Sequence, residues 1–92
     1  MTETEIRQLV AEALAYASIP NFQGSATERA FLAATAEVPF SELEIDSLAA
    51  MEICIAIEAN IGTSILPNEL AGIETLSDLV RSIQGKTSAR TL

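Results

Sequence analysis

The sequence predicts a small all-α protein: a four-helix bundle of three main helices and one short helix, with a long first loop in which we expect an extra short helix. The chain has 92 residues, which is the length of one domain. Its composition is 49% hydrophobic but only 4% aromatic, and such an aliphatic core favours packed helices over a sheet sandwich. Apolar residues also recur at helical spacing in three separate segments.

The first helix is predicted over residues 3–17 and has one apolar face. The apolar residues recur at intervals of three and four, as in an amphipathic helix, and are Ile6, Leu9, Val10, Ala13, Leu14 and Ala17. Glu5, Arg7 and Gln8 lie mostly off this face. Pro20 ends the helix, because proline disfavours helical backbone in the residue before it.

Residues 18–46 form a long connection, and a structureless loop of this length is uncommon in a small domain. The Ser-Ala-Thr-Glu sequence at 25–28 has the spacing of a capping box, so we expect a short helix to follow it. Pro39 then returns the chain to an extended form. Three aromatic side chains in this connection are expected to anchor it on the helices: Phe22, Phe31 and Phe40.

Residues 47–60 form the most informative segment. Alternating isoleucines over 53–57 would also suit a β-strand. The length, the alanines and a cap residue at Asp46 or Ser47 favour a helix instead, and Gly62 would end it.

This helix carries two apolar stripes. One is typical of a face that packs into a core and consists of Ala50, Ile53, Cys54, Ile57 and Ile61. The other lies elsewhere on the helix, beside Glu52, and consists of Leu48, Met51, Ile55 and Ala59. A helix that is apolar on two sides in so small a domain is either deeply buried or presents one face to a partner.

Two further helices are predicted towards the end of the chain. Residues 67–71 form one short helical turn. The last helix begins at Glu74 or Thr75 and has on one face Leu76, Leu79, Val80 and Ile83. Gly85 is expected to close it.

These elements predict one domain over residues 1–85 and a polar, flexible tail over 86–92. Because the chain begins at Met1 and lacks flanking Pro- and Ala-rich linkers, we expect a free-standing protein. No apolar run is long enough to span a membrane, and no secretion signal opens the chain. We therefore expect a cytoplasmic monomer that does not contact membranes.

Composition excludes several classes of function. Thirteen acidic against five basic residues give a net charge of -8, which argues against nucleic acid or anionic lipid and for a partner with a basic surface. No lysine or arginine occurs between Arg29 and Arg81, whereas acidic residues recur throughout that interval. The chain has no histidine and one cysteine, so we expect no catalytic residue, no metal site and no internal disulfide.

The segment 40–48, Phe-Ser-Glu-Leu-Glu-Ile-Asp-Ser-Leu, resembles the acyl carrier protein family, whose members commonly carry Asp-Ser-Leu at the start of the second helix. The resemblance extends to two acidic residues on the helix that follows, to the Ile-Leu-Pro sequence at 65–67 and to the Thr-Leu pair that opens the last helix. It covers roughly residues 3–84 and is weakest over 18–39.

The resemblance implies that Ser47 carries a prosthetic group. In the family this serine is esterified by 4′-phosphopantetheine, which a phosphopantetheinyl transferase transfers from coenzyme A, and the terminal thiol then holds acyl groups as thioesters. Asp46 would help to bind the transferase or its metal ion. From the residues alone, a serine at a helix N-terminus suits an incoming phosphate but also serves as an ordinary N-cap.

Part of the second apolar stripe, together with two acidic residues of the same helix, then becomes a candidate surface for partner enzymes, which consists of Leu48, Met51, Glu52, Ile55 and Glu58. The expected partners are an acyl-loading ligase or acyltransferase and ketosynthase-type or other acyl-processing enzymes with basic surfaces. Alternatively, Met51 and Ile55 pack under the first loop. Cys54 lies on the core stripe, where a buried structural thiol is expected.

The chain departs from the family pattern in two places. Glu44 stands where a glycine is usual, so the turn before Asp46 must form without a permissive residue or adopt another shape. The connection over 18–46 is also longer than in general fatty acid carriers. Both departures favour a specialised carrier.

Three hypotheses follow from these observations. The first is a free-standing acyl carrier protein, not itself an enzyme, that serves polyketide, specialised lipid or fatty acid biosynthesis. The second keeps the fold but changes the cargo, as in an aminoacyl or peptidyl carrier of a nonribosomal-peptide-type pathway. The third is of a different class: a helical adaptor in which Ser47 is unmodified and acts only as a cap.

Overall fold

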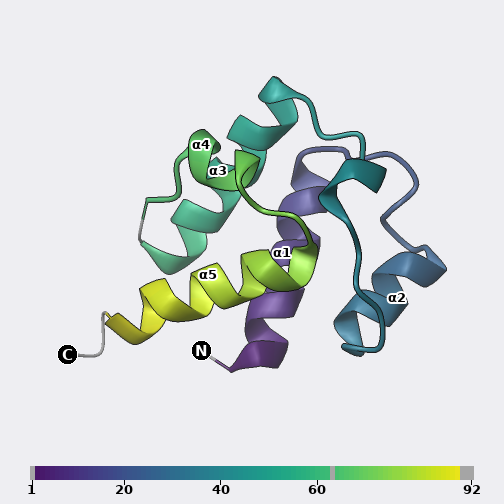
Figure 1. The fold of residues 1–92 in the computed structure, drawn as a ribbon, viewed down its shortest axis with the longest axis horizontal. Helices are drawn as coiled ribbons and strands as arrows, with labels where there is room; N and C mark the ends of the chain where they lie inside the picture. Colours follow the sequence, from purple (N-terminus) through teal and green to yellow (C-terminus); the bar gives the residue numbers. More distant parts are fainter. Residues whose placement is uncertain (1, 63, 90–92) are drawn as a thin grey trace.

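Five α-helices and one turn of 3₁₀ helix make up the fold in the computed structural model, which describes residues 2–62 and 64–89 (Figure 1). In chain order they are α1 (Glu3–Tyr16), α2 (Ala26–Leu32), the 3₁₀ turn η1 (Phe40–Glu42), α3 (Ser47–Ile61), α4 (Pro67–Ala71) and α5 (Leu76–Ala89). Helix α1 packs against α2, α3 and α5, whereas α4 packs on α3. The predicted all-α class is confirmed, and no helix of the described residues is long and apolar enough to cross a membrane.

Helix α1 has the apolar face that the sequence predicts, and every residue of that face is buried. The helix begins at a capping box, in which the Glu5 N–H donates to the Thr2 hydroxyl and the Thr2 N–H donates to the Glu5 carboxylate. It ends where Ser18 adopts a left-handed backbone with a φ of 57° and the Ile19 N–H donates to the Leu14 carbonyl at 3.1 Å.

The extra helix expected in the long connection is present as α2. Ser25 caps it, because its hydroxyl accepts a hydrogen bond from the Glu28 N–H at 3.1 Å. Phe22 and Phe31 are fully buried as predicted, with their ring centroids 6.4 Å apart. Phe40 is only partly buried against the core.

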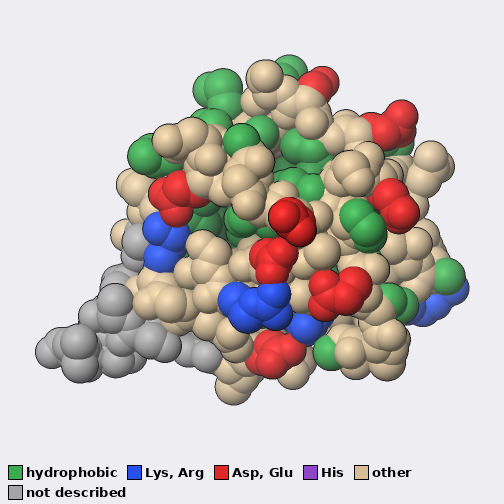
Figure 2. Space-filling view, in the orientation of Figure 1, with side chains coloured by type: hydrophobic (Ala, Val, Ile, Leu, Met, Phe, Trp, Pro, Cys, Tyr) green, Lys and Arg blue, Asp and Glu red, His purple; other side chains and the backbone are tan. Residues whose placement is uncertain are grey.

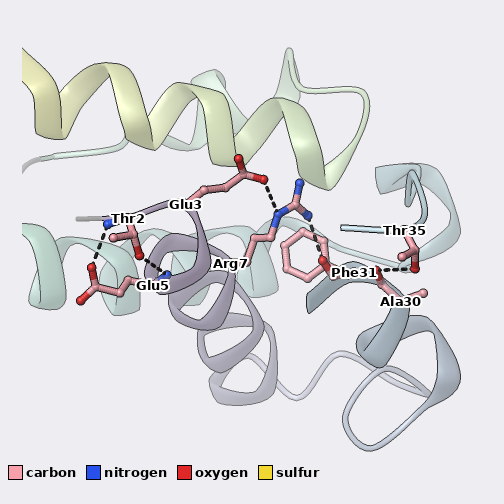
Figure 3. A network of polar contacts seen from close by, with 7 residues as sticks. All are labelled: Thr2, Glu3, Glu5, Arg7, Ala30, Phe31 and Thr35. Atoms are coloured by element: carbon pink, nitrogen blue, oxygen red, sulfur yellow. Dashed lines mark hydrogen bonds and ion pairs between the residues drawn. The ribbon is translucent and has the colours of Figure 1, made fainter. Parts of the chain in front are cut away.

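A buried arginine joins α2 to α1 (Figure 3). The Arg7 guanidinium lies 5.0 Å from the centroid of the Phe31 ring and donates to the Phe31 carbonyl at 2.9 Å. It also pairs with the Glu3 carboxylate at 2.8 Å. The sequence places Arg7 mostly off the apolar face of α1 and does not predict its burial, which arises because α2 covers this part of α1.

Helix α3 supplies much of the core. Of its predicted core stripe, Ala50 is partly buried and the other four residues are buried; Ala49, which the stripe omitted, is also buried. The predicted glycine stop is confirmed, since Gly62 has a left-handed φ of 71° and donates its N–H to the Glu58 carbonyl at 2.8 Å.

The end of α5 differs from the prediction. Thr75 and Asp78 cap its start through reciprocal backbone-to-side-chain hydrogen bonds at 3.2 Å, but Gly85 does not close it, and the helix runs on to Ala89. Gly85 is not among the residues with positive φ, so it does not adopt the left-handed conformation that ends helices. The part of the predicted flexible tail before residue 90 is thus helical, and 90–92 lie outside the described residues.

Candidate functional site

Ser47 is the first residue of α3, and its side chain is exposed. Asp46, rather than Ser47, is the N-cap: its Oδ1 accepts a hydrogen bond from the Ala49 N–H at 2.7 Å. The Ser47 hydroxyl makes no hydrogen bond with any described residue. Capping therefore does not occupy Ser47, and its hydroxyl faces solvent beside the positive end of the helix dipole.

The turn before Asp46 keeps a left-handed residue although it lacks a glycine. Glu44 has a φ of 49°, a conformation that is disfavoured by about 1 kcal/mol for residues with a Cβ. Leu43 is buried next to it and fixes the turn on the core. Further back, the Phe40 N–H donates to the Glu74 carbonyl at 2.8 Å, which ties the chain ahead of Ser47 to the start of α5.

An open cleft of about 490 Å³ lies on one side of Ser47, between η1, α3 and α4. Apolar side chains from all three segments line much of it, among them Phe40, Ala50 and Leu70. Ser47 and Asp46 lie among the lining residues as well. The apolar cleft therefore begins directly beside Ser47, so a chain attached at this residue could enter it.

The amino-acid sequence matches the family model described as "Phosphopantetheine attachment site" over residues 26–83. The chain belongs to this family. Its prosthetic group is covalently bound 4′-phosphopantetheine, as the resemblance to acyl carrier proteins implied. No curated protein and no solved structure matches the chain.

The residues around Ser47 fit the prosthetic group of this family. The exposed hydroxyl leaves room for a bulky phosphodiester, and the orphan N–H groups of the first turn of α3 suit its charge. The adjoining cleft suits an uncharged arm, because its walls are mainly apolar. The described residues hold no cluster of carboxylates or thiols able to bind a metal ion.

The second apolar stripe of α3 lies on the surface of this carrier chain. The side chains of Leu48, Met51 and Ile55 are 66%, 51% and 51% exposed, so the alternative that Met51 and Ile55 pack under the first loop is wrong. Glu52 and Glu58 are half-buried and border the stripe on opposite sides, given the 3.6-residue helical repeat. Figure 2 shows hydrophobic side chains gathered where α3 and α4 lie, with the visible Lys and Arg side chains below them.

Besides the cleft beside Ser47, two further features of the site were not predicted from the sequence. A second hollow, of about 360 Å³, lies on another flank of α3, and three carboxylates line it: Glu44, Asp46 and Glu52. Leu66, just before α4, is 54% exposed and adds a further apolar side chain to the surface. Only the acidic composition of residues 37–58 could have indicated the hollow lined by carboxylates.

Cys54 is buried, as predicted, and is only 4% exposed. Burial, followed by the negative charges of Glu58 and Glu69, raises the pKa of its thiol. A raised pKa keeps the thiol protonated at neutral pH, and the protonated form is a poor nucleophile. Cys54 is therefore a packing residue of this carrier domain.

Proposed function

We propose that the protein is an acyl carrier protein that bears 4′-phosphopantetheine on Ser47 and presents acyl thioesters to enzymes of polyketide, specialised lipid or fatty acid biosynthesis. The observation that supports Ser47 most directly is its exposed hydroxyl at the first position of α3. This hydroxyl makes no capping hydrogen bond, because Asp46 is the N-cap of the helix. The apolar cleft beside it favours acyl over aminoacyl cargo, because a buried ammonium group would lack a partner along most of those walls.

Attachment requires Ser47 to act as the nucleophile in a reaction that another protein catalyses. Its Oγ forms a bond to the phosphorus of coenzyme A that carries the pantetheine, the diphosphate P–O bond breaks, adenosine 3′,5′-bisphosphate leaves, and the hydroxyl proton passes to a base. This chain has no histidine to supply that base, so a phosphopantetheinyl transferase provides it. Asp46 is exposed and lies next to the nucleophile, which supports the proposal that it meets the transferase or its metal ion.

Partner enzymes are proposed to bind the exposed surface of α3, through Leu48, Met51, Glu52, Ile55 and Glu58. The apolar side chains would supply contact area, and the acidic residues would attract basic surfaces and speed the encounter. The helix itself carries no basic residue. Such an interface favours short-lived complexes, which a carrier that visits several enzymes needs.

Intact-protein mass spectrometry tests the attachment. After incubation with coenzyme A and a broad-specificity phosphopantetheinyl transferase, the wild type is expected to gain the mass of one phosphopantetheine. Ser47→Ala should gain none. Ser41→Ala is the matched control, because Ser41 is also exposed and lines the same cleft, and it should be modified like the wild type. A wild type that stays unmodified would leave the helical adaptor as the better interpretation.

A further inference from the structure

Helix α4 forms one wall of the cleft beside Ser47, yet it is short. It spans the five residues Pro67–Ala71, and three of them line the cleft: Pro67, Leu70 and Ala71. A helix of this length has little stability of its own in water. Leu70 is its one buried residue. The position of this wall therefore depends on what ties α4 to its neighbours.

One ion pair ties α4 to the last turns of α5. Lys86 Nζ lies 3.0 Å from Glu69 Oε2, and the two side chains are only 24% and 36% exposed. The other carboxylate oxygen of Glu69 accepts a hydrogen bond from the Leu66 N–H at 3.3 Å. The same carboxylate thus caps the start of α4 and joins it to α5.

Lys86 reaches Glu69 because α5 continues past Gly85. A Cβ at Gly85 would meet no atom within 4 Å, so nothing in the surroundings requires a glycine there. Glycine is a weak residue within a helix, since it loses more backbone freedom than alanine on folding. The turn that presents Lys86 is therefore held less firmly than its neighbours.

We propose that Lys86 is a positioning residue which, through Glu69, holds α4 against the cleft and so limits how far the cleft opens beside Ser47. A narrower cleft would shelter cargo on the prosthetic arm, and this consequence rests on the proposed attachment at Ser47. The contact that holds α4 does not depend on that attachment. Glu69 has no basic neighbour on α4 itself. Loss of Lys86 should therefore loosen α4 locally without unfolding the core.

Amide hydrogen exchange of the whole chain, followed by NMR, tests the hold on α4. The informative amides are those of Leu70, Gly72 and Ile73, which close the backbone hydrogen bonds of α4 and its C-terminal turn. In Lys86→Gln they should exchange about twofold to fivefold faster, the range expected for loss of a partly exposed ion pair. The amide of Ile57 in α3 should not change, which separates local opening from global unfolding.

Three further variants sharpen this test. Lys86→Arg keeps the positive charge, so the α4 amides of this variant should exchange at the wild-type rates. Gly85→Ala should slow exchange in α4, because it firms the turn that carries Lys86. Arg81→Gln is the matched control: Arg81 pairs with Asp78 within α5, so this ion pair connects no second element. Equal exchange in Lys86→Gln and Arg81→Gln would overturn the proposal.

A chemical readout on the loaded protein tests the shelter of the cleft. With a hexanoyl thioester on the prosthetic group, attack by hydroxylamine should be about twofold to fivefold faster in Lys86→Gln than in the wild type or Arg81→Gln. Faster exchange in α4 with an unchanged rate of thioester attack would refute control of the cleft. If no transferase modifies Ser47, the proposed function fails, and hydrogen exchange on the unmodified chain still decides whether Lys86 holds α4.

Discussion

Replacement of Arg7 with methionine should destabilise the fold by about 2 kcal/mol, far more than an average surface substitution. The variant loses a hydrogen bond from a charged group to the Phe31 carbonyl, worth about 1.5–3 kcal/mol, and the cation–π contact, worth about 2 kcal/mol at a buried site. The ion pair adds little, because Glu3 is 52% exposed. Relief from burying a charge, together with the apolar contacts that methionine keeps, offsets part of the loss.

Urea unfolding followed by far-ultraviolet circular dichroism measures the change in the free energy of unfolding. In thermal unfolding followed by the same signal, the melting temperature should fall by about 8–16 °C. Arg29→Met is the matched control, because Arg29 also donates to a backbone carbonyl, that of Gly24, but is exposed. It should change the free energy of unfolding by less than about 0.5 kcal/mol. A loss for Arg7→Met no larger than that for Arg29→Met would refute the claim that the guanidinium holds α2 on α1.

Three other predictions concern backbone strain, recognition and pH. Glu44→Gly should raise the free energy of unfolding by about 0.5 kcal/mol, because relief of the positive φ exceeds the added entropy of the unfolded chain. Glu44→Gln keeps the Cβ and should not raise it. Equal stability of the two variants would contradict the claim that Glu44 is strained. Glu52→Lys should raise the KM of a partner enzyme for the loaded carrier, and the defect should shrink with added salt. Glu12→Lys reverses a charge at an exposed position of α1 and should leave this KM unchanged. An equal rise in KM for both variants would show that only net charge matters. The Lys86 ion pair lowers the pKa of Glu69, so the stabilisation of α4 by this pair is fully present above the ordinary glutamate pKa and is lost as pH falls through the lowered value. The difference in α4 amide exchange between wild type and Lys86→Gln should therefore vanish in acid, and a difference that persists below about pH 2 would argue against the pair.

Periodicity predicts where helices form in this chain but not always where they end. Gly62 and Gly85 look alike in the sequence, each following an apolar helical segment. Gly62 takes a left-handed φ and ends α3, whereas α5 passes through Gly85. After Gly85, the residue that follows has a partner in the folded chain, since helical Lys86 pairs with Glu69 on α4. That partner is distant in sequence, so local signals do not reveal it.

In the site, too, local features were predicted from the sequence, whereas features formed by distant segments were not. Ser47 was singled out by the resemblance to acyl carrier proteins, and the exposed stripe was predicted because it depends on one helix alone. The cleft was not, because its walls come from three separate segments that meet only in the folded chain. The burial of Arg7 was not predicted for a related reason: α1 alone would leave it exposed, and the packing of α2 buries it. Glu44 was correctly singled out, but only the structure shows that the chain keeps the strained turn.

The burial of Cys54 has a consequence for a protein whose cargo is a thioester. A reactive thiol on the chain would compete for the acyl group by S-to-S exchange, or would form a disulfide with the thiol of its own prosthetic arm. The sole cysteine is enclosed by the core, and its raised pKa keeps it protonated. In the protein that carries the prosthetic arm without an acyl group, as proposed, the arm would therefore present the one reactive thiol. Labelling with a maleimide reagent would then count the arms that carry no acyl group.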